Sequence, residues 1–128
     1  MEKKKHILLL TTGGTIASVP GGTATVSDCW FDGKINATNA VRTGGMIGNV
    51  QNNLTVTISN CLYTGTTTGG KAGGYYGGLV GIGAYNTTIN VSNCLVAGDM
   101  TGVTAGTVGA VAGNNPGGNR STYTNVYA

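Results

Sequence analysis

Short segments of the chain alternate apolar and polar residues, as β-strands with one buried face do. Residues 54–59 show the alternation most clearly, with three aliphatic side chains separated by three hydroxyl side chains. The phase slips after Ser59-Asn60, and apolar positions resume at Cys61 and Tyr63. We therefore predict a bend at this polar pair, because asparagine tolerates the left-handed backbone that a corner needs.

The segment around this bend recurs along the chain. Residues 26–33, 58–65 and 91–98 align with one another, and a truncated fourth copy covers residues 123–128 with Val126 at the cysteine position. The aligned cysteines are Cys29, Cys61 and Cys94. A second marker of glycines and aliphatic residues keeps step with the first and ends each time in a glycine, at Gly48, Gly81 and Gly113. Two markers in phase indicate a tandem repeat.

Each copy predicts two or three short strands, which are too few to bury an apolar face alone. Stacked copies can bury it together, with equivalent residues about 4.8 Å apart along the axis. The 24 glycines and only 9% charged residues favour short strands and tight turns. We predict an all-β fold, a short β-solenoid of about three coils with an extra N-terminal strand.

The repeat resembles the GLUG repeat of bacterial surface proteins and adhesins over about residues 24–128. Gly78-Leu79-Val80-Gly81 carries the core of that motif literally, and residues 45–48 and 109–113 are looser versions. The resemblance implies an extracellular or cell-surface β-solenoid used for attachment or as a stalk, with no known ligand. We expect a structural or adhesive module whose partners are carbohydrate or host-surface ligands and which associates end to end through its open edges.

In-register stacking would place Cys29, Cys61 and Cys94 in an inward-pointing ladder. Small buried side chains that fill the same notch in successive coils are the favoured interpretation, and Val126 in the fourth copy agrees with it. A disulfide between neighbours is a second interpretation, because their spacing lies within the range that a disulfide spans. A metal site is not expected, since zinc sites need closely spaced Cys or His pairs and His6 is the only histidine.

Residues 3–20 do not follow the repeat. Residues 6–10 predict an apolar strand, and the following Thr12-Gly13-Gly14-Thr15-Ile16-Ala17 resembles the start of bacterial L-asparaginases. That resemblance implies an alternative function, a fragment of an amidohydrolase with Thr15 at the nucleophile position. We divide the chain at the Pro20-Gly21-Gly22 junction, into an asparaginase-like segment (1–22) and a repeat domain (23–128). A fusion, a composed sequence or a strand that caps the solenoid would each explain the join.

Catalysis is not expected. A threonine hydroxyl needs a base and an orienting group, and its oxyanion needs preorganised donors. The Thr-Asp motif that the resemblance would supply is missing, as is the long β/α pattern of that family. The glycine-rich segment 69–74 lacks the Lys-Ser or Lys-Thr of a phosphate loop, and the acidic residues lack the spacing of calcium-binding β-rolls. We expect no cofactor.

Charge and hydropathy exclude further classes of function. The net charge of +3 owes much to Lys3, Lys4 and Lys5, and the other basic residues are scattered without aromatic neighbours, which argues against nucleic-acid binding. No apolar run is long enough for membrane insertion, and the run at residues 7–10 is too short for a signal peptide. Tyr75, Tyr76 and Tyr85 are candidate stacking residues for sugars, although buried or hydrogen-bonded tyrosines are the favoured interpretation.

Overall fold

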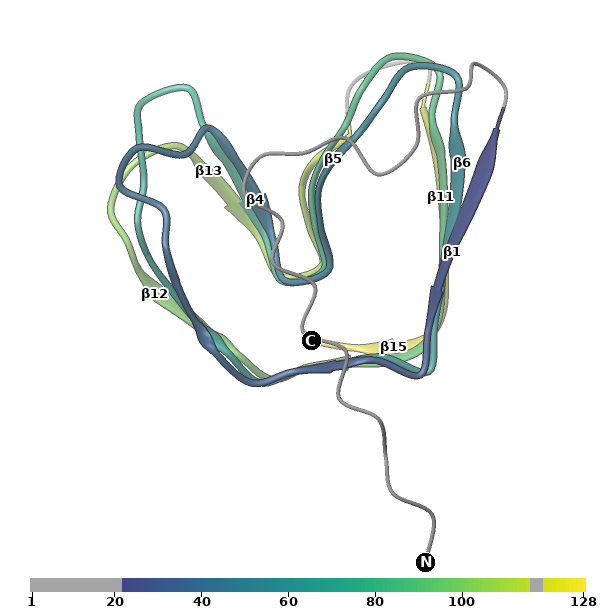
Figure 1. Cartoon of the computed structure of the whole chain (residues 1–128), viewed down its shortest axis with the longest axis horizontal. Helices are drawn as coiled ribbons and strands as arrows, with labels where there is room; N and C mark the ends of the chain where they lie inside the picture. The colour runs from purple at the N-terminus through teal and green to yellow at the C-terminus, as the bar shows by residue number, and fades with distance from the viewer. Residues whose placement is uncertain (1–21, 116–118) are drawn as a thin grey trace, which may run out of the picture.

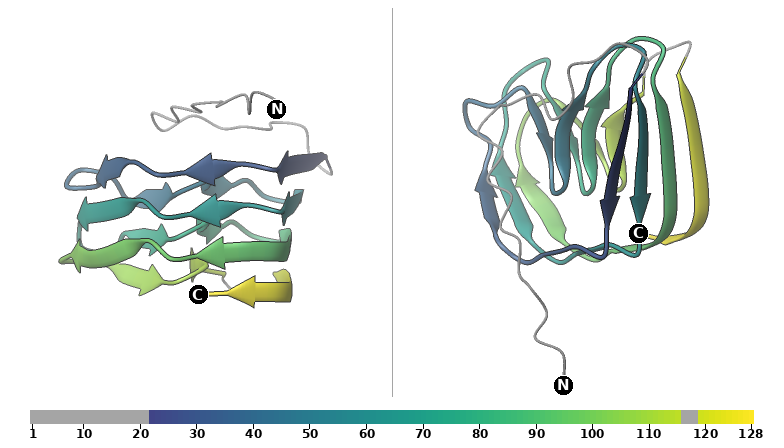
Figure 2. Two further views of the ribbon diagram at one scale, coloured as in Figure 1. Left: turned by 90° about the horizontal axis from the view of Figure 1, so that it is seen from below. Right: turned by 45° about the vertical axis from the view of Figure 1, so that its right-hand side comes forward.

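Stacked coils of parallel strands form the protein in a computed structural model, which describes residues 22–115 and 119–128 (Figure 1). Each pairing between the described strands is parallel and joins a coil to the next one. The predicted all-β solenoid of about three coils is confirmed. Its coils lie in successive layers when the solenoid is viewed from the side (Figure 2).

Each of the first two coils contains five strands. The first coil consists of β1 (Thr23–Ser27), β2 (Trp30–Phe31), β3 (Lys34–Asn36), β4 (Arg42–Gly44) and β5 (Ile47–Val50). The second consists of β6 (Thr55–Ser59), β7 (Leu62–Tyr63), β8 (Thr66–Gly69), β9 (Tyr75–Gly77) and β10 (Val80–Gly83). The third has β11 (Thr88–Val96), β12 (Asp99–Val103), β13 (Thr107–Gly109) and β14 (Ala112–Asn114), and β15 (Arg120–Tyr127) begins a fourth.

The expectation of two or three strands in each copy was therefore wrong. The strands that it missed include Thr66–Gly69, which is mostly threonine, and Tyr75–Gly77, which follows a glycine-rich segment; neither has an alternating apolar pattern. Their backbone hydrogen bonds run to the neighbouring coils, as in Thr66 N to Gly33 O at 2.8 Å and Asp99 N to Gly65 O at 2.9 Å. A ladder between stacked coils needs no alternation within the segment, so periodicity alone could not detect it.

The predicted corner at the Ser-Asn pair is present in successive coils. The corner residues have left-handed backbones with φ between 52° and 56°: Asp28, Asn60, Asn93 and Asn125. Apolar positions resume after the corner as expected, with Cys61 and Tyr63 both buried. In the third coil β11 runs through the corner as one strand from Thr88 to Val96, although Asn93 at the corner has no partner in the ladder.

Each coil also folds inward at its second glycine marker. Figure 1 shows the bend between the ladder β4–β9–β13 and the ladder β5–β10–β14, which divides the cross-section into two lobes. The bend stacks through backbone bonds between coils, from Gly45 N to Gly78 O and from Gly78 N to Ala110 O, both 2.9 Å. Leu79 at its tip is completely buried. The glycine marker of the sequence therefore builds a partition through the interior.

The two lobes have different interiors. The lobe between the β1–β6–β11–β15 ladder and the β5–β10–β14 ladder is filled by aliphatic side chains: Val50, Leu54, Val56, Ile58, Val80, Ile89 and Val91. We call it the aliphatic lobe. The second lobe, which the β3–β8–β12 and β4–β9–β13 ladders enclose, contains aromatic and hydroxyl side chains that include Tyr63, Thr67 and Tyr76. We call it the aromatic lobe.

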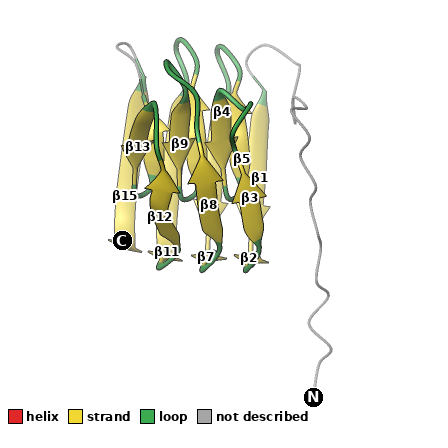
Figure 3. Ribbon diagram, turned by 90° about the vertical axis from the view of Figure 1, so that its left-hand side faces the viewer, coloured by secondary structure: helices red, strands yellow, loops and turns green. Residues whose placement is uncertain are grey.

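Both ends of the described stack present strands with one neighbour. Figure 3 shows β3, β8 and β12 side by side, and β12 forms the outer edge at the C-terminal end. Because β15 pairs only with β11, it leaves β12, β13 and β14 as an open edge. The predicted extra N-terminal strand lies outside the described residues, so the boundary between residues 22 and 23 stays a prediction.

Candidate functional site

The cysteines occupy one row, on the inner side of the corner. Cys61 and Cys94 are buried and Cys29 in the first coil is half-buried, and all three thiols are free. Each Sγ donates to the carbonyl oxygen two residues earlier, at 3.1 Å to Ser27, 3.2 Å to Ser59 and 3.2 Å to Ser92. In the partial fourth coil, Val126 pairs with Cys94. The row therefore packs like a column of small apolar side chains whose S–H groups are hydrogen-bonded.

Burial also suppresses the reactivity of the middle thiol. The pKa of Cys61 is raised to about 11, chiefly by burial; a backbone hydrogen bond with Cys29 lowers it, and the neighbouring Cys94, Cys29 and Asp28 add to the rise. The thiolate is the form that attacks electrophiles and binds metals. Cys61 is therefore protonated near neutral pH and is unsuited to nucleophilic catalysis.

The glycines that end the second marker lie where the two ladders of the inward bend touch. A Cβ on Gly81 would overlap the Gly48 carbonyl oxygen and stand 2.6 Å from Thr43 N. A Cβ on Gly113 would overlap Tyr76 N and stand 2.6 Å from Gly81 O. At Gly48 the nearest atom is Arg42 O at 3.0 Å. Glycine is required here because one backbone lies directly against another.

Two tyrosines are locked into the aromatic lobe. Tyr63 stacks on Phe31 with ring centroids 5.7 Å apart and an interplanar angle of 13°. Its hydroxyl is hydrogen-bonded to Thr67 Oγ1 at 2.7 Å, and burial raises its pKa. The hydroxyl of Tyr76 accepts from Lys71 N and donates to Ala40 O, both at 2.7 Å.

The tyrosines named as candidate stacking residues therefore differ in access. Tyr76 is completely buried and is unavailable to a ligand, and Tyr75 is half-buried in β9. Tyr85 is 64% exposed on the turn that follows β10. Sequence reasoning grouped these rings because they lie close along the chain, but the fold separates inward from outward positions.

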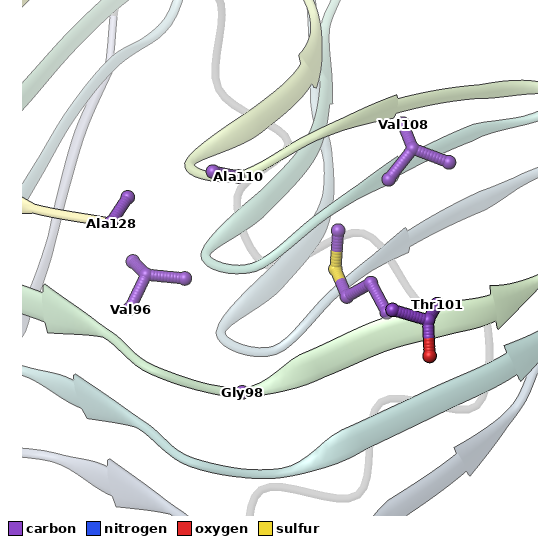
Figure 4. Close-up of a pocket in the computed structure, with 7 residues that line it drawn as sticks. Val96, Gly98, Thr101, Val108, Ala110 and Ala128 are labelled. Carbon is purple, nitrogen blue, oxygen red and sulfur yellow. The ribbon is translucent and has the colours of Figure 1, made fainter.

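A cavity of about 370 Å³ opens at the C-terminal end of the aromatic lobe (Figure 4). Its lining is almost entirely apolar: Val96, Gly98, Met100, Thr101, Val108, Ala110 and Ala128. Val96 pairs with Tyr63 and Val108 pairs with Tyr76, so valines stand where the second coil has rings. The cavity lies at the open end of the stack, where the two valines occupy less space than the rings with which they pair.

None of the lining side chains is an acid, a base or a thiol. The carboxylate of Asp99 is engaged by the lining residue Thr101, whose hydroxyl and backbone N–H donate to Asp99 Oδ1 at 2.7 and 2.8 Å. These bonds lower the pKa of Asp99. The cavity can hold an apolar group but not carry out chemistry. Its sequence signal is the change from tyrosine to valine at aligned positions, which sequence reasoning missed.

The described residues bring together no group of three His, Cys, Asp or Glu side chains that could hold a metal ion. None of the elements described is a helix long and apolar enough to cross a membrane. Thr15 lies outside the described residues, so its predicted role as a nucleophile stays a prediction. Comparison of the chain with models of protein families, with curated proteins and with solved structures found no match.

Proposed function

We propose that the protein is a non-catalytic repeat module that acts as a stalk or an adhesive surface outside a bacterial cell. The observation that carries the proposal is the in-register stacking, which repeats similar side chains along the outer faces of the solenoid. Thr23 pairs with Thr55 and Thr55 pairs with Thr88, for example, and Ser27, Ser59 and Ser92 form a parallel row. A surface of repeated rows suits a partner that also repeats.

The extracellular location rests on the resemblance to GLUG repeats of bacterial surface proteins. The side chains are consistent with a scaffold, because the buried polar groups that could act in catalysis are engaged in packing. The Tyr63 and Tyr76 hydroxyls and the three thiols all bond to neighbouring groups. No observation on the described residues favours the amidohydrolase alternative.

Two measurements test the proposal. Beads coated with the chain should bind to cultured mammalian cells more than beads coated with Gly81→Ala, in which the backbone clash disrupts the stack. Ammonia release from L-asparagine should be absent from both the parent chain and Thr15→Ala. If cells retained both kinds of bead equally, the adhesive role would be wrong. Ammonia release by the parent chain but not by Thr15→Ala would show an amidohydrolase.

A further inference from the structure

Two rows of side chains run next to each other along the outside of the corner. The first consists of the corner residues Asp28, Asn60, Asn93 and Asn125, which we call the amide row. The second lies two residues further along each coil and consists of Trp30, Leu62, Leu95 and Tyr127, which we call the apolar row. Together they form the corner stripe. The apolar row lies on β2, β7, β11 and β15, and Figure 2 (left) shows the coils from below as parallel layers.

Three members of the apolar row are exposed although they are large, and the fourth, Leu62, is half-buried. Trp30 pairs with Leu62, Leu62 with Leu95, and Leu95 with Tyr127, so the row is continuous. Trp30 is 55% exposed, Leu95 45% and Tyr127 69%. An exposed apolar row bordered by polar side chains indicates a binding surface rather than a surface adapted only to water.

Trp30 is held in place before any ligand arrives. Its indole N–H donates to Thr64 Oγ1 in the second coil at 2.8 Å. The bond fixes the indole against the neighbouring coil and leaves more than half of the side chain in solvent. A ring that is already ordered loses less conformational entropy on binding.

The amide row is fixed by the backbone. The left-handed conformation of its residues keeps them on the outside of the corner, where all four are exposed. Asn60 Nδ2 donates to Asp28 Oδ1 at 3.3 Å, and Asn125 Nδ2 donates to Asn93 Oδ1 at 3.1 Å. A carboxamide has two donor hydrogens and an acceptor oxygen, so each asparagine keeps hydrogen-bonding capacity for a ligand.

The size and charge of the stripe define the kind of partner. Four rungs at about 4.8 Å extend for less than roughly 20 Å, and a row one side chain wide falls far short of the roughly 800 Å² that each partner buries in a standard protein–protein interface. The stripe carries amides and one carboxylate, Asp28, and no basic side chain. An anionic ligand would find no cation to pair with, so the complementary ligand is narrow, linear and neutral.

We propose that the corner stripe binds an extended neutral polysaccharide chain. The C–H faces of the sugar rings would lie on Trp30 and Tyr127, and the hydroxyl groups along the chain would bond to the amide row. Aromatic residues with a polar group suit such contacts, because they combine a large apolar area with few rotatable bonds. This inference rests on the adhesive form of the proposed function and assigns it a ligand class and a site.

The sole tryptophan of the chain makes the test direct. Cellohexaose and chitohexaose are titrated into the full chain, and binding is followed by calorimetry and by the fluorescence of Trp30. We expect binding of at least one of them, with a change in the Trp30 emission. Trp30→Ala and Tyr127→Ala should weaken binding, measured by calorimetry, about tenfold or more. Asn93→Gly, which keeps the left-handed backbone, should weaken it several-fold.

Tyr85→Ala is the matched control, because Tyr85 is as exposed as Tyr127 but lies on the turn at the opposite end of β11. It should bind like the parent. The proposal is overturned if the folded chain binds neither hexasaccharide at millimolar concentration, if binding leaves the Trp30 emission unchanged, or if Tyr85→Ala loses as much affinity as Trp30→Ala. It is also overturned if Trp30→Ala instead abolishes association between copies in the absence of sugar.

The two proposals fail in different ways. If Trp30→Ala beads still adhere to cells as strongly as parent beads, the glycan site is wrong and the adhesive module stands. If parent beads do not adhere to cells but the chain binds cellohexaose through Trp30, the host-surface role is wrong and the glycan site stands.

Discussion

The ring of Tyr63 lies directly over the backbone of Gly98 in the following coil, where any Cβ would overlap the ring. Phe31 lies over Gly65 in the same way, one coil earlier. Each ring of the column therefore needs a glycine in the next coil, because any side chain there would overlap the ring. The column ends at Val96, and the cavity opens beyond it.

Extending this column should stabilise the protein. In Val96→Phe a ring would continue the Phe31–Tyr63 stack into the cavity, above Gly78, which has no side chain to obstruct it. Aromatic pairing adds about 1 kcal/mol beyond the burial of area, so we expect the free energy of unfolding in urea to rise by about that amount. Val41→Phe, at a position that is 45% exposed, is the control and should change little. An unchanged midpoint for Val96→Phe would contradict the account of the cavity.

Gly81→Ala should destabilise the fold strongly. Its Cβ would overlap the Gly48 carbonyl oxygen in a contact between two backbones, which cannot relax by rotating a side chain. We expect a loss of about 3 kcal/mol or more, the upper range for overpacking. The comparison is Gly48→Ala, whose nearest neighbour is Arg42 O at 3.0 Å, and whose cost should be clearly smaller. Equal costs in thermal unfolding would show that close approach is not the reason for glycine.

The corner can be tested with a pair of substitutions at one position. Asn93 has φ 52°, a conformation that costs an ordinary residue about 1–2 kcal/mol and glycine almost nothing. Asn93→Ala should therefore be less stable than Asn93→Gly by about 1 kcal/mol in urea unfolding. Both variants lose the hydrogen bond with Asn125, so the difference between their free energies of unfolding measures the cost of the left-handed backbone alone. If Asn93→Ala were more stable than Asn93→Gly, the left-handed backbone assigned to this corner would be refuted.

Cys61 should make stability depend on alkaline pH. Burial raises its pKa to about 11, so the folded state holds the thiol proton more tightly than the unfolded state. This contribution is complete below the ordinary thiol pKa of about 9 and is lost as the pH rises towards 11. Two pKa units correspond to at most about 2.7 kcal/mol. Urea unfolding between pH 8 and 11 measures the loss, and Cys61→Val should show a flatter profile over this range.

The open C-terminal edge should promote association of the chain. β12 and β13 have unpaired edges next to the exposed Val108, and such edges pair with other chains. We expect the sedimentation coefficient to rise with concentration. Charges introduced by Met100→Lys and Val108→Lys should reduce this rise. A monomer whose sedimentation does not depend on concentration would disprove the prediction.

The sequence alone determined the repeat, the parallel stacking and the corner. The cysteine row and the left-handed asparagines could be read from it because they depend on local periodicity and on the backbone preference of one residue type. The all-β class followed from the same signals, since a copy that cannot bury its own apolar face has to stack on a neighbour.

Only the tertiary structure decided the shape of the cross-section and the positions of the candidate surfaces. The inward bend, the two lobes and the extra strands arise because backbones of different ladders meet, and such contacts leave no periodic pattern in one segment. The cavity depends on Val96 and Val108 lining the same lobe, although they lie on different strands. Trp30 and Asp28 look ordinary in the sequence, and their place in the corner stripe depends on stacking that aligns four coils in register.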